Sequence, residues 1–355
     1  MTQPKIRLAF VDTSHHHFTG VSRAAMECPT VEVVGVYTID PIQREAQRAQ
    51  YSAFTFFDSL DELYDKGKPQ AVITCADNLH GADVVSWAAE RGLPVMKEKP
   101  MAASLKVAEQ MLTTANKLGV RLMINWSTNW RASTHLAKRL IDEGRIGQVW
   151  QVHNRSGHGG PPPDYLTQEP SRRIGWEWLI DRERNGAGAY IDFCSYGAVL
   201  SRWLMGQPSR VSAMGGRYFK NFFTVDDNAV LLMGYPKGHS IAEGTWTQPA
   251  VPTRIPTMIY GSKGAIAITA DDEVQVATVG ADPRSPKVET LKPDPLPDHY
   301  QSGPAYFSYC LLNEKPFEGI VDPEVSRDAQ EVLEAGLISM KLGQEVGLPL
   351  KAFLE

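Results

Sequence analysis

The sequence predicts an α/β fold, in which an N-terminal doubly wound parallel sheet is followed by an α+β domain with a large, mainly antiparallel sheet. Short β-rich runs alternate with helical patterns over the first third of the chain, which is typical of a parallel sheet with crossover helices. From residue 148 onward the apolar pattern shifts toward alternation. The length of 355 residues indicates about two domains. We therefore predict domains at 1–124 and 125–355.

The first domain is expected to alternate strands and helices. The strands are predicted at Lys5–Val11, Val31–Tyr37, Ala71–Cys75, Pro94–Met96 and Arg121–Ile124. The helices are predicted at Gly20–Met26, Ile42–Gln50, Ser59–Asp65, His80–Glu90 and Ser104–Leu118, the last with Ser104 as its cap. Right-handed crossovers place every strand-to-helix loop at one edge of the sheet. Open α/β sheets bind their ligands at that edge.

The second domain is expected to be built mainly of antiparallel strands. They are predicted at Val149–Arg155, Ser209–Met214, Ala229–Tyr235, Ser240–Thr247, Thr257–Tyr260, Ala265–Thr269 and Val274–Val279. Residues 261–264, Gly-Ser-Lys-Gly, are typical of a hairpin connection. Residues 305–312 and 323–342 are predicted as late helices.

Composition excludes several classes of protein. Apolar residues make up 43% of the chain and charged residues 22%, as in globular proteins. The net charge of −5 and the lack of a polybasic tract argue against nucleic acid and anionic membranes as partners. No apolar run has membrane-spanning length, and the N-terminus lacks a signal-peptide pattern, so we expect a cytoplasmic protein. The four cysteines are far apart and predicted to be free and buried.

The loop after the first strand lacks the G-x-G-x-x-G pattern that usually binds a dinucleotide. It runs from Asp12 to Gly20, and only its last residue is a glycine. Thr13, Ser14 and His15 could still donate hydrogen bonds to a phosphate, along a different backbone path. Three consecutive histidines, residues 15–17, do not have the spacing of a metal site, and we predict no metal. The alternative is a solvated loop.

The end of the second strand is the place for an acidic residue that binds the adenosine ribose. Thr38 stands at that position and Asp40 follows two residues later, with no arginine adjacent. This favours NAD as the cofactor, with NADP as the alternative. An ordinary turn and helix start at Asp40-Pro41 explains the same residues equally well.

The stretch Pro94–Pro100 is predicted to be a buried strand that ends in a Lys-Glu-Lys-Pro turn. A Lys-Pro pair at a strand end is usually only a turn, because proline restricts itself and the residue before it. The carboxyl end of a strand in a βαβ series is, however, where such sheets bind ligands. Lys99 is therefore the leading candidate for the chemistry, whereas Lys97 is expected to be a solvated lysine.

Several stretches in order along the chain resemble one enzyme family. The loop at residues 74–80 and the later Glu98-Lys99-Pro100 are similar to the T-P-N-x-x-H loop and the E-K-P of the Gfo/Idh/MocA oxidoreductases, which include glucose-fructose oxidoreductase and inositol dehydrogenase. The resemblance continues through Asn125-Trp126, residues 137–149 and residues 186–196, the last similar to G-G-G-x-L-x-D-x-G-x-H. It covers most of the chain.

The sequence also departs from the family pattern. Cys75, Ala76 and Asp77 stand where the family usually has Thr, Pro and Asn, so that only His80 is kept in that loop. Cys194 replaces a glycine, and Tyr196 stands where many members carry histidine. Members similar to glucose-fructose oxidoreductase carry tyrosine there, so this change is compatible with activity. The missing glycines put the mode of nucleotide binding in question.

The resemblance implies an NAD(P)-dependent oxidoreductase with an N-terminal Rossmann-like domain and a C-terminal substrate and oligomerisation domain. The substrate would be a sugar, a cyclitol or a glycoside, and the chain would form a homodimer or a higher homo-oligomer. Cofactor contacts are expected at Ala76, Asp77, Asn78, His80, Glu98, Asn125 and Trp178, in addition to the loop residues above. Substrate contacts are expected at Lys99, Trp126, His158, Trp176, Asp192 and Tyr196. The tryptophans are as readily explained as packing anchors, and His158 as part of a glycine- and proline-rich loop.

Oxidation of a secondary alcohol requires a base for the hydroxyl proton. Tyr196 is the predicted base, and the ammonium of Lys99 would favour its ionised form. Asp192 lies four residues before Tyr196, which places both on one face of a helix, and it is predicted to orient the substrate or Lys99. A helix cap and a packing tyrosine are the alternatives. At the level of the protein, the alternatives are a non-catalytic sensor of sugar or nucleotide and an enzyme that uses tightly held NAD for glycoside cleavage.

Overall fold

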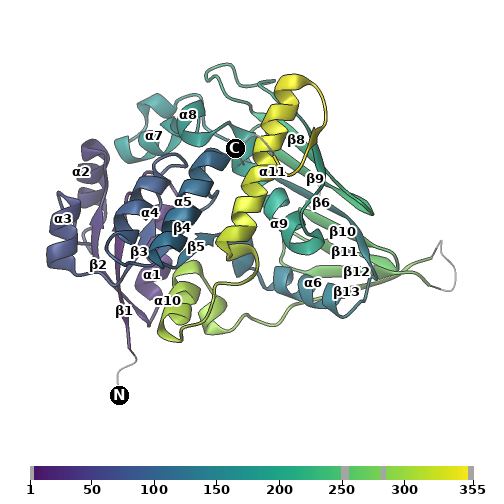
Figure 1. The fold of residues 1–355 in the computed structure, drawn as a ribbon, viewed down its shortest axis with the longest axis horizontal. Coiled ribbons are helices and arrows are strands. Elements are labelled where there is room, and N and C mark those ends of the chain that lie inside the picture. The colour runs from purple at the N-terminus through teal and green to yellow at the C-terminus, as the bar shows by residue number, and fades with distance from the viewer. Residues whose placement is uncertain (1–3, 249–255, 281–284, 351–355) are drawn as a thin grey trace. The chain divides into compact units, whose positions relative to one another are not determined.

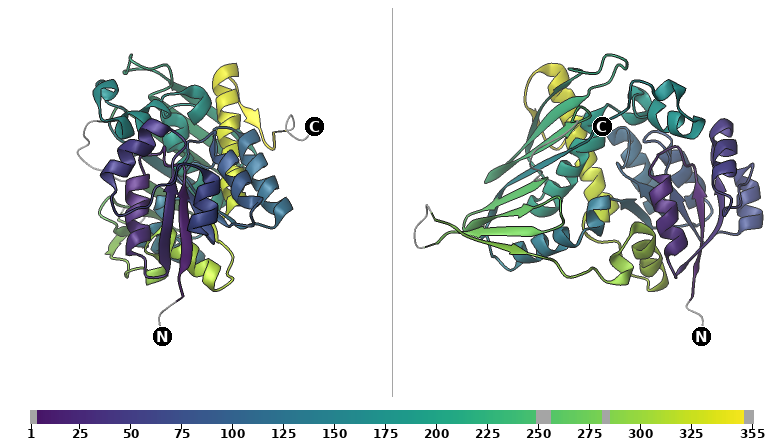
Figure 2. Two further views of the ribbon diagram at one scale, coloured as in Figure 1. Left: turned by 90° about the vertical axis from the view of Figure 1, so that its left-hand side faces the viewer. Right: turned by 180° about the vertical axis from the view of Figure 1, so that it is seen from behind.

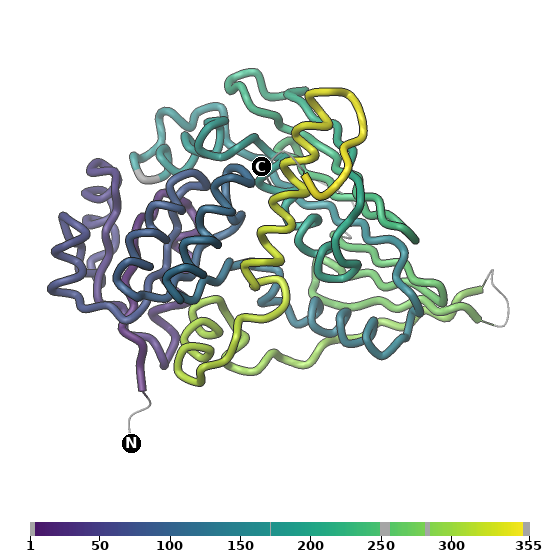
Figure 3. Tube along the Cα trace, in the orientation of Figure 1, coloured from purple at the N-terminus to yellow at the C-terminus, as the bar shows by residue number. Residues whose placement is uncertain are grey.

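The computed structural model describes residues 4–248, 256–280 and 285–350. Contacts within the chain divide it into two compact units. Unit 1 comprises Met1–Ser127, Pro161–Ala187 and Pro297–Arg327, and unit 2 comprises Thr128–Gly160, Gly188–Leu296 and Asp328–Glu355. The sequence predicts one boundary after residue 124, whereas the chain passes repeatedly between the two units, as the trace in Figure 3 shows by residue number.

Unit 1 contains the predicted parallel sheet (Figure 1). Its strands are β1 (Ile6–Val11), β2 (Val31–Tyr37), β3 (Ala71–Thr74), β4 (Val95–Glu98) and β5 (Leu122–Asn125). They pair in the order β2-β1-β3-β4-β5, and every pairing is parallel. All residues of β3, β4 and β5 are buried, as expected for strands covered by helices on both faces. The prediction of a doubly wound sheet is confirmed.

Unit 1 contains the predicted helices after its strands and near residue 305, and also α7 (Pro170–Glu177) and α8 (Arg182–Asn185), which the sequence does not predict. The others are α1 (Phe18–Glu27), α2 (Pro41–Gln50), α3 (Leu60–Glu62), α4 (Gly81–Ala89), α5 (Leu105–Leu118) and α10 (Gly303–Leu312). The hydroxyl of Ser104 accepts from the backbone N–H of Val107 at 3.4 Å and so caps α5, as predicted.

Helix α10 comes late in the chain but belongs to unit 1, where it contacts α1 and β1. The hydroxyls of Thr30 and Ser308 lie 2.7 Å apart. Arg121 Nη1 donates to the carbonyl of Cys310 at 3.0 Å. These bonds attach the α10 segment to residues almost three hundred positions earlier in one case and about two hundred in the other.

Unit 2 contains a nine-stranded sheet in the order β13-β12-β11-β10-β6-β9-β8-β7-β14. Its strands are β6 (Val149–Gly157), β7 (Arg210–Gly216), β8 (Asn228–Tyr235), β9 (Gly238–Thr245), β10 (Thr257–Gly261), β11 (Gly264–Ile268), β12 (Val274–Thr278), β13 (Lys287–Leu291) and β14 (Val346–Gly347). Only β6 and β9 pair in parallel among these strands, so the expectation of a mainly antiparallel sheet is confirmed. Gly261 pairs with Gly264 across the predicted hairpin.

The helices of unit 2 cover one face of this sheet (Figure 2). They are α6 (Ala132–Asp142), the π-helix η4 (Tyr190–Cys194), α9 (Ser195–Met205) and the part of α11 (Pro323–Leu342) that follows Arg327. Leu136 and Leu140 of α6 and Leu200 of α9 pack with buried residues of the sheet, among them Val152 and Ile266. The sequence predicts α11 but neither η4 nor the edge strands β13 and β14.

Two smaller predictions can be compared with the fold. All four cysteines, Cys28, Cys75, Cys194 and Cys310, are free and buried, as predicted. Within the described residues, no helix has both the length and the apolarity that crossing a bilayer requires.

Candidate functional site

The strand order of unit 1 defines where a ligand binds. In an open sheet of order 2-1-3-4-5 the direction of winding reverses between β1 and β3, and the crevice for ligands opens at the carboxyl ends of these strands. The loops after β1 and β3 are joined there by two hydrogen bonds. The N–H of His15 donates to the carbonyl of Cys75 at 2.8 Å, and the N–H of Cys75 donates to the carbonyl of Asp12 at 3.0 Å. The two loops therefore form one continuous edge.

Asp12 makes the turn that a glycine makes in most dinucleotide loops. Its φ angle is +53°, in the left-handed region that Asp and Asn tolerate better than other side chains do. Its buried carboxylate accepts from the Ser14 hydroxyl at 2.7 Å and from the Ser14 N–H at 3.2 Å. Burial raises the pKa of Asp12 to about 6, and the hydrogen bonds from Ser14 offset only part of that rise.

The backbone N–H groups of this loop are largely used within the protein. A glycine-rich loop binds pyrophosphate through free N–H groups at the start of a helix. Here the N–H groups of residues 14, 15, 17 and 18 donate to Asp12 Oδ1, the Cys75 carbonyl, His15 Nδ1 and the His15 carbonyl, respectively. These four N–H groups are therefore already used within the protein.

His15 offers the side-chain donor that the loop otherwise lacks. Its Nδ1 accepts from the N–H of His17 at 3.1 Å, so the proton of the neutral ring is on Nε2. The ring is 1% exposed, and its Nε2 has no hydrogen-bond partner among the described residues. Burial holds the pKa of His15 well below its usual value and so keeps the ring neutral. Trp178 Nε1 is likewise buried without a partner, and the two ring centroids lie 5.0 Å apart.

Two unpaired buried donors are costly, because each loses its bonds to water and gains none. An oxygen-rich ligand such as a dinucleotide would supply the missing acceptors. The residues present at the switch point therefore fit a nucleotide, although not through the usual glycine loop.

The three consecutive histidines could in principle hold a metal ion, because one ligand atom of each lies within 4.8 Å of the others. The hydrogen bonds argue against it. The lone pair of His15 is already used at Nδ1, which leaves a proton rather than a ligand at Nε2. His17 Nδ1 lies 2.8 Å from Glu98 Oε1. The arrangement favours binding of an acceptor over binding of a metal.

A cavity of about 320 Å³ opens between the first loop, α1, α2 and α7. Its lining residues include Thr13, His15, His16, Gln43, Gln47 and Trp176. Thr13 Oγ1 lies 2.6 Å from both Thr38 Oγ1 and Gln47 Oε1. Thr38 is thus buried in a side-chain network, while Asp40 caps α2 by accepting from Gln43 N at 2.8 Å.

Arg44 reaches the end of β2, although it lies six residues beyond Thr38 in the sequence. Its Nη1 donates to the Thr38 carbonyl at 2.8 Å, and its guanidinium lies 5.5 Å from the Tyr37 ring centroid. The sequence showed no arginine adjacent to Thr38. Arg44 lies one turn after the start of α2, and the helix therefore carries its side chain back to the end of β2. The position of Arg44 in the predicted helix could have indicated this contact.

The loop after β3 is fixed by charged and amide side chains of unit 1. Asp77 accepts from the His80 N–H at 2.8 Å and from Arg184 Nε at 2.7 Å. Burial alone would raise the pKa of Asp77, but the His80 N–H and the Arg184 charge hold it below its usual value. Asn78 Nδ2 donates to Asn185 Oδ1 at 2.8 Å. The neighbouring Ala76 is buried.

Glu98 ends β4 and Lys99 begins the turn after it, and both are buried with exposures of 2%. Asn125 Nδ2 donates to Glu98 Oε2 at 2.6 Å from the end of the neighbouring strand β5. Burial would raise the pKa of Glu98, but His17, Asn125 and the Lys99 charge lower it, so Glu98 is ionised. The peptide bond between Lys99 and Pro100 is cis.

The prediction of a solvated Lys97 is wrong. The side chain is fully buried, and its Nζ donates to the Pro100 carbonyl at 2.7 Å and to Asn78 Oδ1 at 3.3 Å. A Cβ at Gly81 would lie 2.8 Å from Lys97 Cε, so the start of α4 leaves room for this stem. Burial lowers the pKa of Lys97 to about 8. The lysine thus links the turn after β4 to the loop after β3.

The predicted tryptophans of unit 1 lie in three different settings. Trp126 is buried and donates from Nε1 to Ser326 Oγ at 2.9 Å. Trp176 lies within α7, donates to Gln168 Oε1 at 3.2 Å and has its ring centroid 5.4 Å from that of His16. Trp178 follows α7 and packs on His15 as described above.

In unit 2, Asp192 and Tyr196 lie at the junction of η4 and α9. Asp192 is buried, and its Oδ2 accepts from Trp246 Nε1 at 2.9 Å. Single π-helical turns of this kind occur frequently at functional sites. Tyr196 lines a cavity of about 260 Å³ together with Phe193.

His158 is the first residue after β6. Its side chain is exposed, and its Nδ1 accepts from the Gly160 N–H at 2.7 Å. The ring meets Phe193 edge to face, with centroids 4.9 Å apart. His158 therefore neighbours the Tyr196 cavity through Phe193.

The glycines before Asp192 have packing roles. A Cβ at Gly186, whose φ is +94°, would lie 2.1 Å from the Ala103 carbonyl oxygen. A Cβ at Gly188 would lie 1.9 Å from the Asp226 carbonyl oxygen. Gly186 therefore allows the backbone of Ala103 to approach, and Gly188 allows the backbone of Asp226 to approach.

Most of the predicted site residues therefore lie in unit 1. They are Thr13, Ser14, His15, Thr38, Asp40, Ala76, Asp77, Asn78, His80, Glu98, Lys99, Asn125, Trp126, Trp176 and Trp178. His158, Asp192 and Tyr196 lie in unit 2. The structure brings the loops after β1 and β3 together, and brings Asp192 and Tyr196 into one segment.

Comparison with known proteins identifies the family. Residues 9–126 match the oxidoreductase family domain with an NAD-binding Rossmann fold, and residues 134–267 match the GFO/IDH/MocA C-terminal domain. The chain belongs to the Gfo/Idh/MocA family. As a member, it is an NAD(P)-dependent oxidoreductase of CH–OH groups, and the predictions of family, fold, enzyme class and cofactor class are confirmed.

Relatives of this Gfo/Idh/MocA chain differ in the reactions for which they are named. D-xylose 1-dehydrogenase [NADP(+)] of Haloarcula marismortui is 26% identical over 74% of this chain and 72% of that protein. The 2,7-anhydro-N-acetylneuraminate hydratase of Mediterraneibacter gnavus is 30% identical over 60% of this chain and about half, 54%, of that protein. A solved structure of aldose-aldose oxidoreductase from Caulobacter crescentus, complexed with glycerol, has 21% identity and a TM-score of 0.80 over 97% of this chain and all of that one.

Proposed function

We propose that this chain oxidises or reduces a secondary hydroxyl or carbonyl group of a sugar, cyclitol or glycoside. In this proposal Lys99 and Tyr196 transfer the proton, and Asp192 orients the reacting group. The observation that carries it is the buried Lys99 at the carboxyl end of β4, at the same sheet edge as the unpaired donors of His15 and Trp178.

NAD(P) supplies the acceptor or donor of a hydride when it is bound. His15 Nε2 and Trp178 Nε1 are proposed to donate hydrogen bonds to it, with Thr13, Ser14, Ala76, Asn78 and Asn125 lining the same edge. Glu98 is proposed to hold His17 and Asn125 in position on the cofactor side. NAD is the proposed preference, and Arg44 at the end of β2 is the residue that would favour NADP.

The proton chemistry follows from the residue types. When an alcohol carbon loses a hydride, its hydroxyl proton must leave, and a phenolate at Tyr196 would accept it. An ammonium at Lys99 would stabilise both that phenolate and the alkoxide that develops on the substrate. Asp192 accepts from the indole N–H of Trp246, which fixes the orientation of its carboxylate.

Bound nucleotide is the decisive measurement. Purified protein would be denatured and the supernatant analysed for NAD(H) and NADP(H), and the remaining protein titrated with both. We expect nucleotide to be released or to bind below millimolar concentrations. If it is neither carried nor bound, the proposed reaction is excluded.

Two other functions draw on particular observations. The internal use of the loop N–H groups is what a non-catalytic sensor with a weakened nucleotide site would show. The hydratase named among the relatives favours an enzyme that uses NAD for cleavage or hydration without net oxidation. Net formation of NAD(P)H during turnover separates the proposed reaction from both.

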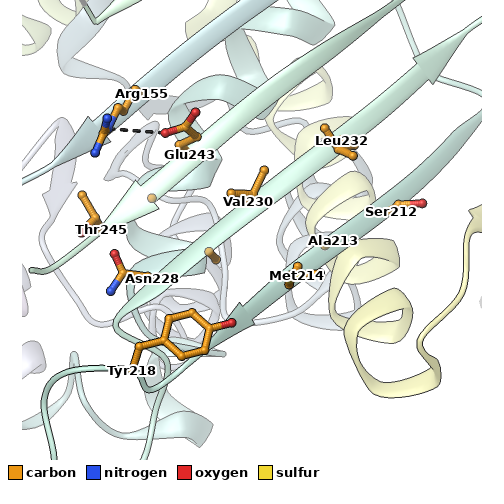
Figure 4. A pocket seen from close by; sticks show the side chains of 12 residues that line it. Arg155, Ser212, Ala213, Met214, Tyr218, Asn228, Val230, Leu232, Glu243 and Thr245 are labelled. Carbon is orange, nitrogen blue, oxygen red and sulfur yellow. Dashed lines mark ion pairs between the residues drawn. The ribbon is translucent and has the colours of Figure 1, made fainter.

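We also propose that the chain forms a homodimer through the open face of the large sheet. Figure 4 shows a hollow on this face, where Met214, Val230 and Leu232 come from neighbouring strands beside Tyr218. Met214 is 74% exposed and Leu232 is 45% exposed. On the solvent face of a sheet in a monomer, polar side chains are expected at such positions. A second copy of the same sheet would bury it. Light scattering should give the mass of a dimer for wild type and of a monomer for Leu232→Asp. If the variant keeps the mass of the wild type, this face is not the dimer interface.

A further inference from the structure

The cavity beside Tyr196 lies wholly within unit 2 and has a distinctive lining. It measures about 260 Å³, slightly below the roughly 300–1,000 Å³ of pockets for drug-sized ligands, which suits a monosaccharide. Its polar lining comes from Thr128, Arg131, Thr134, Asn154, Ser156, Tyr196 and Thr257. Most of these groups are hydroxyls, which match the hydroxyls of a sugar.

Arg131 and Tyr196 are the ionisable residues among the described residues that line this cavity. No aspartate or glutamate is among them, so the charged group of the described lining is the guanidinium of Arg131, which Asp272 partly neutralises from outside the lining. Sites for neutral sugars commonly use carboxylates to accept from the sugar hydroxyls, whereas the described lining of this cavity has none and the proposed Asp192 serves the reacting group alone. The absence therefore points to a ligand that brings its own negative charge.

Arg131 is held in place while one end of its guanidinium stays free. Its Nε donates to Asp272 Oδ1 at 3.1 Å, and its Nη2 donates to the Thr269 carbonyl at 3.0 Å. Asp272 Oδ1 also accepts a hydrogen bond from the Ser133 hydroxyl, so the negative charge of Asp272 is divided between Arg131 and Ser133. Nη1 makes no hydrogen bond within the part of the chain that the structure describes. Asp272 and the Thr269 carbonyl thus orient the guanidinium of Arg131, which lines the cavity and keeps Nη1 for a further hydrogen bond.

We propose that the substrate of this enzyme is a sugar acid, whose carboxylate binds Arg131 while its hydroxyls bind the threonines and serine of the Tyr196 cavity. This rests on the proposed function, because Tyr196 marks the cavity as the substrate site. A carboxylate is favoured over a phosphate, because a phosphate dianion needs more positive charge than one partly neutralised arginine supplies. The reaction remains the oxidation of a hydroxyl to a carbonyl, with the hydride passing to NAD(P)⁺ and the proton to the base.

The first experiment compares matched substrates on the full-length wild-type protein. Initial rates of NAD(P)H formation would be measured with glucose, glucuronate, galactose, galacturonate and glucose 6-phosphate. We expect kcat/KM for the acids to exceed that for the neutral sugars and the phosphate about tenfold or more. If the neutral sugars react equally well, the substrate proposal is wrong while the proposed oxidoreductase function stands.

The second experiment replaces the arginine. Arg131→Gln should raise KM for the acid by about 10- to 100-fold, the value of hydrogen bonds to a charged group, with little change for neutral sugars. Arg131→Lys should restore part of the loss. Arg202→Gln is the matched control. Arg202 forms a similar ion pair, with its Nε 2.7 Å from Asp328 Oδ2, and it does not line the cavity. A loss that is equal for acid and neutral sugar would overturn the role of Arg131.

A third measurement requires no turnover. Thermal unfolding of the nucleotide-free protein would be followed with and without glucuronate, using glucose as the comparison. We expect glucuronate to raise Tm in wild type and in Arg202→Gln but not in Arg131→Gln. Stabilisation that is the same with both sugars, or that persists in Arg131→Gln, would reject the acid site. Because no nucleotide is present, this result stands apart from a failure to bind NAD(P).

Discussion

The loop after β1 and the turn after β4 lie at the same edge of one sheet, yet they differ in how they depart from the family. The turn keeps the Glu-Lys-Pro motif, and its charged side chains are buried and paired. The loop lacks the glycine pattern, uses the N–H groups of residues 14, 15, 17 and 18 within the protein, and offers buried side-chain donors such as His15 Nε2. The turn thus keeps the residues proposed for the chemistry, while the loop lacks the glycine pattern that usually binds the cofactor. Each of the following experiments tests one side of this contrast.

The largest expected effect is at the turn. Lys99→Ala should lower kcat by about 10³-fold, as expected for the loss of a group in proton transfer. Nucleotide affinity and the far-UV circular dichroism spectrum should stay as in wild type. Lys106→Ala, on the exposed surface of α5, is the control. Unchanged turnover in Lys99→Ala would remove the lysine from its proposed role.

Combining Lys99→Ala with Tyr196→Phe tests whether the two act on one proton. If they do, the double variant should be scarcely slower than the slower single variant. Independent effects would multiply instead, which would separate Lys99 of unit 1 from Tyr196 of unit 2 in function.

The second effect concerns the buried Lys97 near the end of β4, just before the turn. Because its pKa is lowered from 10.5 to about 8, the unfolded chain binds more protons than the folded one between these pH values. Stability should therefore rise as pH increases from about 8 to about 10.5, by up to about 3 kcal/mol. Urea unfolding at several pH values should show this rise in wild type and not in Lys97→Met. Parallel pH profiles of the two proteins would contradict the burial of the charge.

The third effect is in the loop and has the opposite sign. The pKa of Asp12 is raised from 3.8 to about 6, so the folded protein binds more protons than the unfolded chain between these values. Its contribution to stability should fall as pH increases from about 4 to about 6, by somewhat less than 3 kcal/mol. Asp12→Asn keeps a side chain that tolerates positive φ and removes the titration. The difference in unfolding free energy between variant and wild type should grow across this range.

The smallest effect tests the side-chain donors of the loop. His15→Phe should weaken nucleotide binding about tenfold in calorimetric titration, the value of a hydrogen bond to a charged acceptor. The nucleotide-free protein should not lose stability through that donor, because Nε2 bonds to none of the residues that the structure describes. Trp178→Phe keeps an aromatic ring against His15 and removes the second donor. Equal nucleotide affinity in both variants and wild type would show that the loop binds nothing through these groups.

The sequence predicted the parallel sheet well, because buried parallel strands are short, apolar and separated by amphipathic helices. It ended β4 at Met96, whereas the strand continues through Lys97 and Glu98. Two charged residues normally end a buried strand, and here tertiary partners far along the chain satisfy them. The same cause made Lys97 look solvated. Strand β13 was missed because all of its residues are exposed or partly exposed, which leaves little apolar pattern at a sheet edge.

The site was predicted as far as motifs and strand ends allow. Lys99, Glu98 and Asp192 could be proposed because they lie in short local patterns that resemble those of the family, and their roles stay predictions. Arg184 was not, because its partner Asp77 is 107 residues away and no local pattern announces an ion pair. The positive φ of Asp12 and the π-helical turn at η4 are backbone features that side-chain types do not reveal.

The return of α10 to unit 1 has a consequence for synthesis on the ribosome. The strands β1 to β5 are complete once residue 125 has emerged, but the partners of Thr30 and Arg121 are Ser308 and Cys310. The face that α10 covers therefore stays open while the whole of β6 to β13 is being translated. Chaperones that recognise exposed apolar surface would meet this domain during that interval, and truncation before residue 303 would leave the face permanently exposed.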